Sequence, residues 1–185
     1  MAEDTTQQNT CETLILKSGN TESFREVFRN YYSQLYLYGY KIIQDKNVLE
    51  DTIQELFLEL WNNNNTSEIQ SVKAYLFKSL QYKLYKKIAL KKGTPLGDSF
   101  IVDVPFEINK ETLLVEEENE KERASFVGDL LNALTPRQRE IVYLRFYRNM
   151  DYEEISYIMQ INYQAARNLL SQSLKALKTA GTRLK

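Results

Sequence analysis

Apolar positions recur at helical spacing along most of the chain, and three such stretches follow one another closely near its C-terminus. Thr135-Pro136-Arg137-Gln138 has the pattern of a helix start: a capping threonine, a proline at the first helical position and a glutamine that completes the cap. This first helix is expected to run to about Arg148 with its apolar residues on the inner side. Those residues are Ile141, Val142, Leu144 and Phe146.

A short second helix is predicted to begin at Asp151, with Glu154 three residues further on as the capping-box partner. Ile155, Ile158 and Met159 form its apolar side. Residues 160–162 make the turn, and Asn162 caps a third helix that runs to about Lys178. Its residues expected to be buried are Ala166, Leu169, Leu170, Leu174 and Leu177. This order of elements is typical of a helix-turn-helix.

The outer side of the third helix is polar and cationic, with Gln164, Arg167, Asn168, Ser171 and Lys175. Asn and Gln match adenine edges, Arg matches guanine, and Ser and Lys suit phosphates. From Pro136 onward the chain has nine Lys or Arg against four Asp or Glu. The pattern favours DNA binding, and the alternative is a solvated face in an all-helical bundle.

The N-terminal half predicts three longer helices. The first begins between Asn20 and Ser23 and ends near Gln44, the second spans about Asn47–Trp61, and the third about Ser71–Lys91. Residues 1–20 lack periodicity and are expected to form a loose arm. We therefore predict an all-α protein with two small helical domains, residues 21–95 and 125–185, joined by an acidic linker over residues 96–124.

Composition narrows the chemistry. The chain has no histidine and a single cysteine, Cys11, which excludes the common His-based nucleophile arrangements, an internal disulfide and Cys-based zinc sites. No apolar run approaches the roughly 18 residues that span a bilayer, and the first 13 residues are polar. We expect a soluble, cytoplasmic protein that is not an enzyme, is not inserted in a membrane, and has no cofactor or metal.

Charge is distributed in blocks along the chain. Between Glu68 and Asp98 there are seven lysines and no acidic residue, whereas residues 98–122 contain nine acidic residues against two lysines. Two cationic segments separated by an acidic one predict two contacts with one polyanion.

The second predicted helix has an acidic outer face. Ile53, Leu56, Phe57 and Leu60 can face inward, while Asp51, Gln54, Glu55 and Glu59 stay outside. An acidic face does not bind phosphates, so it indicates a protein partner with basic residues, for which Trp61 is a candidate anchor. The alternative is a solvated acidic face beside a core tryptophan.

The third predicted helix combines lysines with aromatic rings. Its inner residues are Leu76, Phe77, Leu80, Leu84 and Ile88, and its outer residues are Tyr75, Lys78, Tyr82, Tyr85 and Lys86. Lysines attract phosphates, and rings stack on unpaired bases, so the face suits opened or single-stranded DNA. The alternative is half-buried tyrosines with solubilising lysines.

Taken together, these motifs resemble the sigma-70 family of RNA polymerase sigma factors over residues 20–180. Asp51-x-x-Gln54-Glu55-x-Phe57-x-x-Leu60-Trp61, followed by Tyr75-Leu76-Phe77, is similar to region 2 of that family. Leu134-Thr135-Pro136-Arg137-Gln138-Arg139-Glu140, Tyr152-x-Glu154-Ile155 and the run 162–169 are similar to region 4. The presence of only these two regions resembles the extracytoplasmic-function subgroup, and the Asn162-Tyr163-Gln164 turn resembles its Bacteroides-type versions.

The resemblance implies partners and site residues: core RNA polymerase, promoter DNA and an anti-sigma protein, with the factor a monomer outside the holoenzyme. The implied core-polymerase contacts are Asp51, Gln54, Glu55, Phe57, Leu60 and Trp61. The implied contacts with the melted −10 element are Tyr75, Lys78, Tyr82, Lys83, Tyr85, Lys86 and Lys87. The implied −35 contacts are Arg137, Arg139, Asn162, Tyr163, Gln164, Arg167, Asn168, Ser171 and Lys175. The acidic linker would run along the nucleic-acid channel of the polymerase.

The −10 helix departs from the family pattern. Where the family usually has Asn, Asp and Arg, this chain has Tyr82, Lys86 and Ala89, so the base contacts of the first two are not carried over. Two other functions remain open. One is a stand-alone helix-turn-helix regulator that binds duplex DNA without polymerase, and the other is a helical adaptor that binds only protein.

Overall fold

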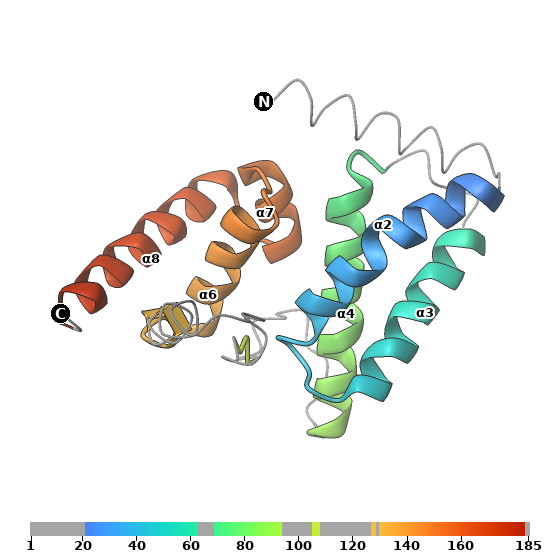
Figure 1. The fold of residues 1–185 in the computed structure, drawn as a ribbon, viewed down its shortest axis with the longest axis horizontal. Helices are drawn as coiled ribbons and strands as arrows, with labels where there is room; N and C mark the ends of the chain where they lie inside the picture. The colour runs from blue at the N-terminus through green and yellow to red at the C-terminus, as the bar shows by residue number, and fades with distance from the viewer. Residues whose placement is uncertain (1–20, 63–68, 94–104, 108–126, 129, 184–185) are drawn as a thin grey trace, which may run out of the picture. The chain divides into compact units, whose positions relative to one another are not determined.

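The computed structural model describes residues 21–62, 69–93, 105–107, 127–128 and 130–183, and its elements over these ranges are all helical (Figure 1). This confirms the all-α prediction. The chain divides into two compact units, Met1–Val102 and Asp103–Lys185. The expected arm over residues 1–20 and most of the expected linker lie outside the described residues. Within the described part, no helix is long and apolar enough to cross a membrane.

The first unit is built from α2 (Thr21–Gly39), α3 (Lys46–Asn62) and α4 (Val72–Lys91), and each helix packs against the other two (Figure 1). The Ser71 side chain caps α4 by accepting a hydrogen bond from the Ala74 amide at 3.2 Å. The core lies between the three helices and includes Leu35, Tyr38, Leu49, Ile53, Leu56, Phe57, Leu60, Leu76, Phe77, Leu80 and Leu84. The inner residues predicted for α3 are therefore buried, and those for α4 are buried except Ile88, which is half-buried.

Helix α2 ends at Gly39, about one turn before the predicted end at Gln44. A turn follows, in which the Lys41 and Ile42 amides donate to the carbonyls of Tyr38 and Gly39. Gly39 allows a close approach to α3, because a Cβ there would lie 2.4 Å from Cδ1 of Leu49. The apolar pattern continues past this point, which is why periodicity alone placed the end too late.

The second unit contains α6 (Pro136–Val142), a π-helical turn η3 (Tyr143–Tyr147), α7 (Tyr152–Met159) and α8 (Tyr163–Arg183). Helix α8 packs against α6 and α7 (Figure 1). Both predicted capping boxes are present, with Thr135 and Gln138 at the start of α6 and Asp151 and Glu154 at the start of α7. Local sequence therefore determines where these two helices begin.

Two residues predicted to be buried in this unit are exposed. Phe146 is 59% exposed, because it lies two positions beyond buried Leu144 and so points to the other side of the helix, while buried Tyr143 takes the inner position. Leu174 is 43% exposed, because the buried stripe of α8 continues from Leu170 to Ser173. Leu169 and Leu177 are half-buried, and Ala166 and Leu170 are buried as predicted.

Candidate nucleic-acid interface

The turn between α7 and α8 is held by local hydrogen bonds. Gln160 adopts a left-handed conformation (φ 53°), which ends α7. The Asn162 side chain accepts a hydrogen bond from the Ala165 amide at 2.7 Å, which satisfies a free backbone donor at the start of α8. From α6, Nη2 of Arg137 donates to the Met159 carbonyl at 2.9 Å. The end of α7 and the start of α8 are thus fixed by local bonds, Arg137 ties the end of α7 to α6, and α7 packs against α8.

The outer face of α8 is open to solvent. Its exposed residues are Tyr163, Gln164, Arg167, Asn168, Ser171 and Lys175. Nε2 of Gln164 donates to Oδ1 of Asn168 at 3.0 Å, and the Arg167 guanidinium lies 6.0 Å from the centre of the Tyr163 ring. These contacts order the side chains within the face and leave donors and acceptors available to a ligand. We refer to these six residues as the α8 face.

Two of the implied −35 contacts, Arg137 and Arg139, are half-buried within the second unit. Arg137 is half-buried and bonded to Met159, as described above. Arg139 is half-buried, its Nε has no hydrogen-bond partner within the described part of the chain, and burial lowers its pKa, opposed by the charge of Glu107. The structure therefore places the two arginines beside the helix-turn-helix rather than on the α8 face.

Two aromatic contacts of this unit were not expected from sequence. Phe106, inside the predicted acidic linker, is 2% exposed and packs on the Tyr143 ring with 5.7 Å between ring centroids. Arg148 donates to the Tyr143 hydroxyl from Nε at 2.8 Å and from Nη2 at 2.6 Å, while burial raises the pKa of Tyr143. An aromatic residue after Pro105 in an acidic stretch was the available signal. Residues 105–107 belong to the second unit.

Helix α3 presents the predicted acidic surface. Asp51, Gln54, Glu55 and Glu59 are exposed. We call these four residues the α3 face. Phe57 and Leu60, named with them as polymerase contacts, are 3% and 2% exposed and form part of the core. Trp61 is neither a fully exposed anchor nor a core tryptophan, because the residue is 44% exposed and its ring contacts the Phe24 ring edge-on with 4.9 Å between centroids.

Helix α4 presents its predicted tyrosines and lysines to different extents. Tyr82 and Lys86 are exposed, whereas Tyr75, Lys78 and Tyr85 are half-buried. Burial lowers the pKa of Lys78. Together with Lys83 and Lys87, these residues form what we call the α4 face. The ring of Tyr82 and the ammonium group of Lys86 are its most accessible groups.

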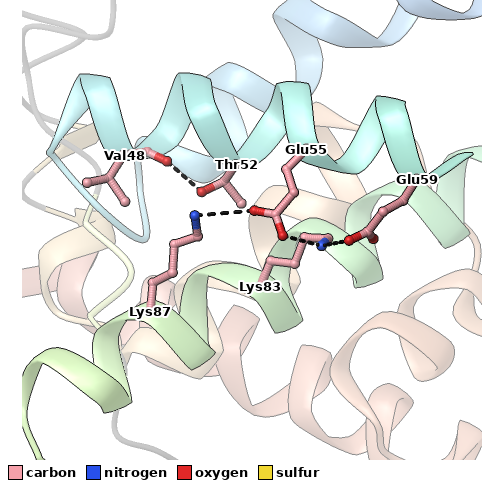
Figure 2. Close-up of polar contacts among 6 residues, drawn as sticks. All are labelled: Val48, Thr52, Glu55, Glu59, Lys83 and Lys87. Atoms are coloured by element: carbon pink, nitrogen blue, oxygen red, sulfur yellow. Dashed lines mark hydrogen bonds and ion pairs between the residues drawn. The ribbon is translucent and has the colours of Figure 1, made fainter.

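An ion-pair network joins the α3 face to the α4 face, as Figure 2 shows. Nζ of Lys83 lies 3.0 Å from Oε1 of Glu55 and 2.6 Å from Oε1 of Glu59. Nζ of Lys87 lies 3.3 Å from Oε2 of Glu55. The hydrogen bond from Lys83 lowers the pKa of Glu55, although burial acts in the opposite direction. Burial by itself would lower the pKa of Lys83, but the hydrogen bonds of Lys83 to Glu59 and Glu55 outweigh it, so the pKa of Lys83 is raised.

The network was not predicted from sequence, where the acids of α3 and the lysines of α4 were assigned to separate partners. Their pairing follows from the packing of α3 on α4. The side chain of Lys83 is only 14% exposed, whereas those of Glu55 and Glu59 are 47% and 57% exposed. Partly exposed pairs of this kind contribute about 0.2–1 kcal/mol each, so the network is too weak to determine the fold.

Comparison with known proteins matches both units. A family model described as "Sigma-70, region 4" matches residues 127–177. The chain is 23% identical over 164 residues to the ECF RNA polymerase sigma factor SigK of Mycobacterium bovis, covering 84% of each chain. It is 22% identical over 160 residues to the ECF RNA polymerase sigma factor SigM of Bacillus subtilis, covering 84% of this chain and 95% of SigM.

A solved structure, that of CnrH in complex with the cytosolic domain of CnrY, has the same fold. It is 14% identical in sequence, with a TM-score of 0.58, and the match covers 92% of this chain and 95% of CnrH. The region 4 match coincides with the helix-turn-helix described above, and the relatives extend the similarity to the first unit. These matches support a function in transcription initiation, as a sigma factor similar to the extracytoplasmic-function members of the sigma-70 family.

Proposed function

We propose that the α8 face reads the −35 element of a promoter as duplex DNA in the major groove. The observation that supports this most directly is the exposure of Gln164, Arg167 and Asn168 on one side of a helix whose start is fixed by the Asn162 cap. Amide and guanidinium groups in this arrangement can make paired hydrogen bonds to adenine and guanine. Ser171 and Lys175, further along the same side, suit phosphates. Arg137 and Arg139 support the helix pair and lie nearer the polymerase flap.

The α3 face is the proposed docking surface for core RNA polymerase. Its acidic residues are exposed on a helix whose inner side is fully packed, so it can present carboxylates to basic residues without rearrangement of the core. Trp61 and Leu58, which are 44% and 62% exposed, offer apolar contact at one end of the helix. Phe57 and Leu60 contribute by holding the helix in place.

The α4 face is proposed to hold the melted −10 element. Exposed Tyr82 offers a ring on which an unpaired base can stack, and exposed Lys86 attracts phosphate. Because Tyr82 and Lys86 replace the family's usual Asn and Asp, the hypothesis assigns this face to strand capture rather than to the family's base contacts.

The factor adds promoter specificity to a polymerase that performs the chemistry, and we propose that it works as a monomer outside the holoenzyme, in the cytoplasm. An anti-sigma protein is a further proposed partner. The structure of CnrH, which was solved in complex with the cytosolic domain of CnrY, supports this proposal. The Asn162-Tyr163-Gln164 turn supports placement among Bacteroides-type versions of the subgroup.

Two binding measurements separate this function from that of a stand-alone regulator. Gel filtration of the purified chain with core polymerase from its own host should give a stable complex, and titration of duplex promoter DNA with the chain alone should give only weak, salt-sensitive binding. A chain that forms no complex with core polymerase and binds duplex operators tightly by itself would be a stand-alone regulator instead.

A further inference from the structure

The ion-pair network of Figure 2 uses residues that belong to two different proposed interfaces. Glu55 and Glu59 lie on the α3 face, which docks on polymerase, and Lys83 and Lys87 lie on the α4 face, which holds DNA. Both carboxylate oxygens of Glu55 are engaged, Oε1 by Lys83 and Oε2 by Lys87. In the isolated chain, each interface therefore neutralises part of the other.

This arrangement has a consequence for both partners. A basic polymerase residue that approaches Glu55 competes with Lys83 and Lys87 for its oxygens. A DNA phosphate that approaches Lys87 competes with Glu55 for the ammonium group. Because the Glu55, Glu59 and Lys87 side chains are between 37% and 57% exposed, either competitor can reach the network from solvent.

We propose that docking on core polymerase releases Lys83 and Lys87 for promoter DNA by taking over Glu55 and Glu59, so that the two interfaces exchange ion-pair partners. The proposal rests on the function proposed above for the α3 and α4 faces. Linkage makes the exchange reciprocal: polymerase raises the affinity of the α4 face for single-stranded DNA by the same factor by which that DNA raises the affinity for polymerase. The exchange therefore favours strand capture by the holoenzyme over strand capture by the isolated chain.

The first test uses the full chain without polymerase and a labelled single-stranded oligodeoxynucleotide, titrated at several salt concentrations. Glu55→Gln releases Lys87 and leaves Lys83 with Glu59, so affinity should rise about fivefold near 0.1 M salt and the salt slope should steepen by about 0.7. Glu55→Gln combined with Glu59→Gln releases both lysines, and the gain should rise to about 25-fold with a slope change of about 1.4.

The matched control is Glu50→Gln, which removes the same charge from the same helix. Glu50 raises the pKa of Tyr32 on α2, after the larger effect of burial, so it lies near α2 and outside the network. The control reports the effect of net charge alone, and its gain should stay well below that of Glu55→Gln. Equal gains and equal salt slopes for the two variants would overturn the exchange.

The second test repeats the titration with saturating core polymerase. The advantage of Glu55→Gln over the wild-type chain should disappear, because polymerase has already taken Glu55 in the wild type. An undiminished advantage would overturn the exchange and leave the proposed function standing. Failure of the wild-type chain to bind core polymerase at all would overturn the proposed function as well, so the two failures are distinguishable.

Discussion

The α8 face and the α4 face are both cationic surfaces on amphipathic helices, but they differ in what the isolated chain does with them. On α8, the described contacts of Gln164, Arg167 and Asn168 run along the helix itself. On α4, Lys83 and Lys87 are paired with carboxylates of a neighbouring helix. The first surface is ready for a ligand, whereas the second is partly neutralised.

The difference is consistent with what each surface is proposed to bind. Duplex DNA is present before polymerase arrives, so a reader of duplex can be preformed. Single-stranded DNA appears only once a promoter is opened, so a surface for it is useful only in the assembled enzyme. Pairing of Lys83 and Lys87 within the chain keeps the single-strand surface partly neutralised until polymerase binds, and the pairs can be broken easily because partly exposed pairs are weak.

The largest expected effect comes from reversing charge on the α3 face. Asp51→Lys with Glu55→Lys places like charges against the basic polymerase surface, and such contacts cost several kcal/mol. Binding to core polymerase should weaken more than about a hundredfold while circular dichroism stays unchanged. Glu26→Lys, on the exposed side of α2, is the control. Unaltered binding of the double variant would remove polymerase docking from the α3 face.

A pair of glycine substitutions tests how tightly each unit is packed. Gly39→Ala drives a Cβ to within 2.4 Å of Leu49 and should lower the free energy of unfolding by about 1–3 kcal/mol. Gly181→Ala in α8 places a Cβ 3.6 Å from Leu130, an ordinary van der Waals contact, and should raise the free energy of unfolding by about 0.5 kcal/mol, since alanine favours helix. Urea unfolding of both variants checks the opposite signs. Destabilisation of equal size would show that the close approach at Gly39 is not special.

Removal of the guanidinium from the α8 face tests direct reading of sequence. Arg167→Ala should reduce discrimination between the preferred −35 element and a scrambled one by about 1–3 kcal/mol, measured as holoenzyme binding to both. Lys175→Ala, further along the helix, should weaken both DNAs alike. An equal loss on both DNAs for Arg167→Ala would make it a phosphate contact.

The smallest expected effect is a pH dependence of the network. The pKa of Glu55 is lowered in the folded chain, so its stabilising contribution is present above the ordinary glutamate pKa, about 4.3, and is lost as pH falls through the lowered value. The advantage of wild type over Glu55→Gln in urea unfolding should therefore stay below about 1 kcal/mol near pH 7 and vanish in acid. Glu50→Gln, which breaks no pair of the network, is the control.

Much of this molecule could be predicted from its sequence because its signals are local. The caps at Thr135 and Asp151 involve residues three positions apart, so both helix starts are encoded within a single turn. The inner stripe of α3 follows from helical periodicity, and Ile53 and Leu56 are buried as that spacing predicts.

What could not be predicted depends on contacts between distant residues. Helix α2 ends at Gly39, where it packs closely against Leu49, and no local pattern encodes that contact. The pairing of Lys83 with Glu55 spans 28 residues, and burial of Phe106 depends on Tyr143 in another element. For the same reason, the α4 face and the α3 face looked independent in sequence although their side chains bind one another.

Promoter recognition by this chain is tested most directly by transcription in vitro with core polymerase over a library of promoters, with and without the chain. Adding the chain should produce transcripts from a small set of promoters sharing −10 and −35 elements, and Arg167→Ala should change which −35 elements are used. Transcripts that are identical with and without the chain, although the chain is folded and present in excess, would contradict promoter recognition.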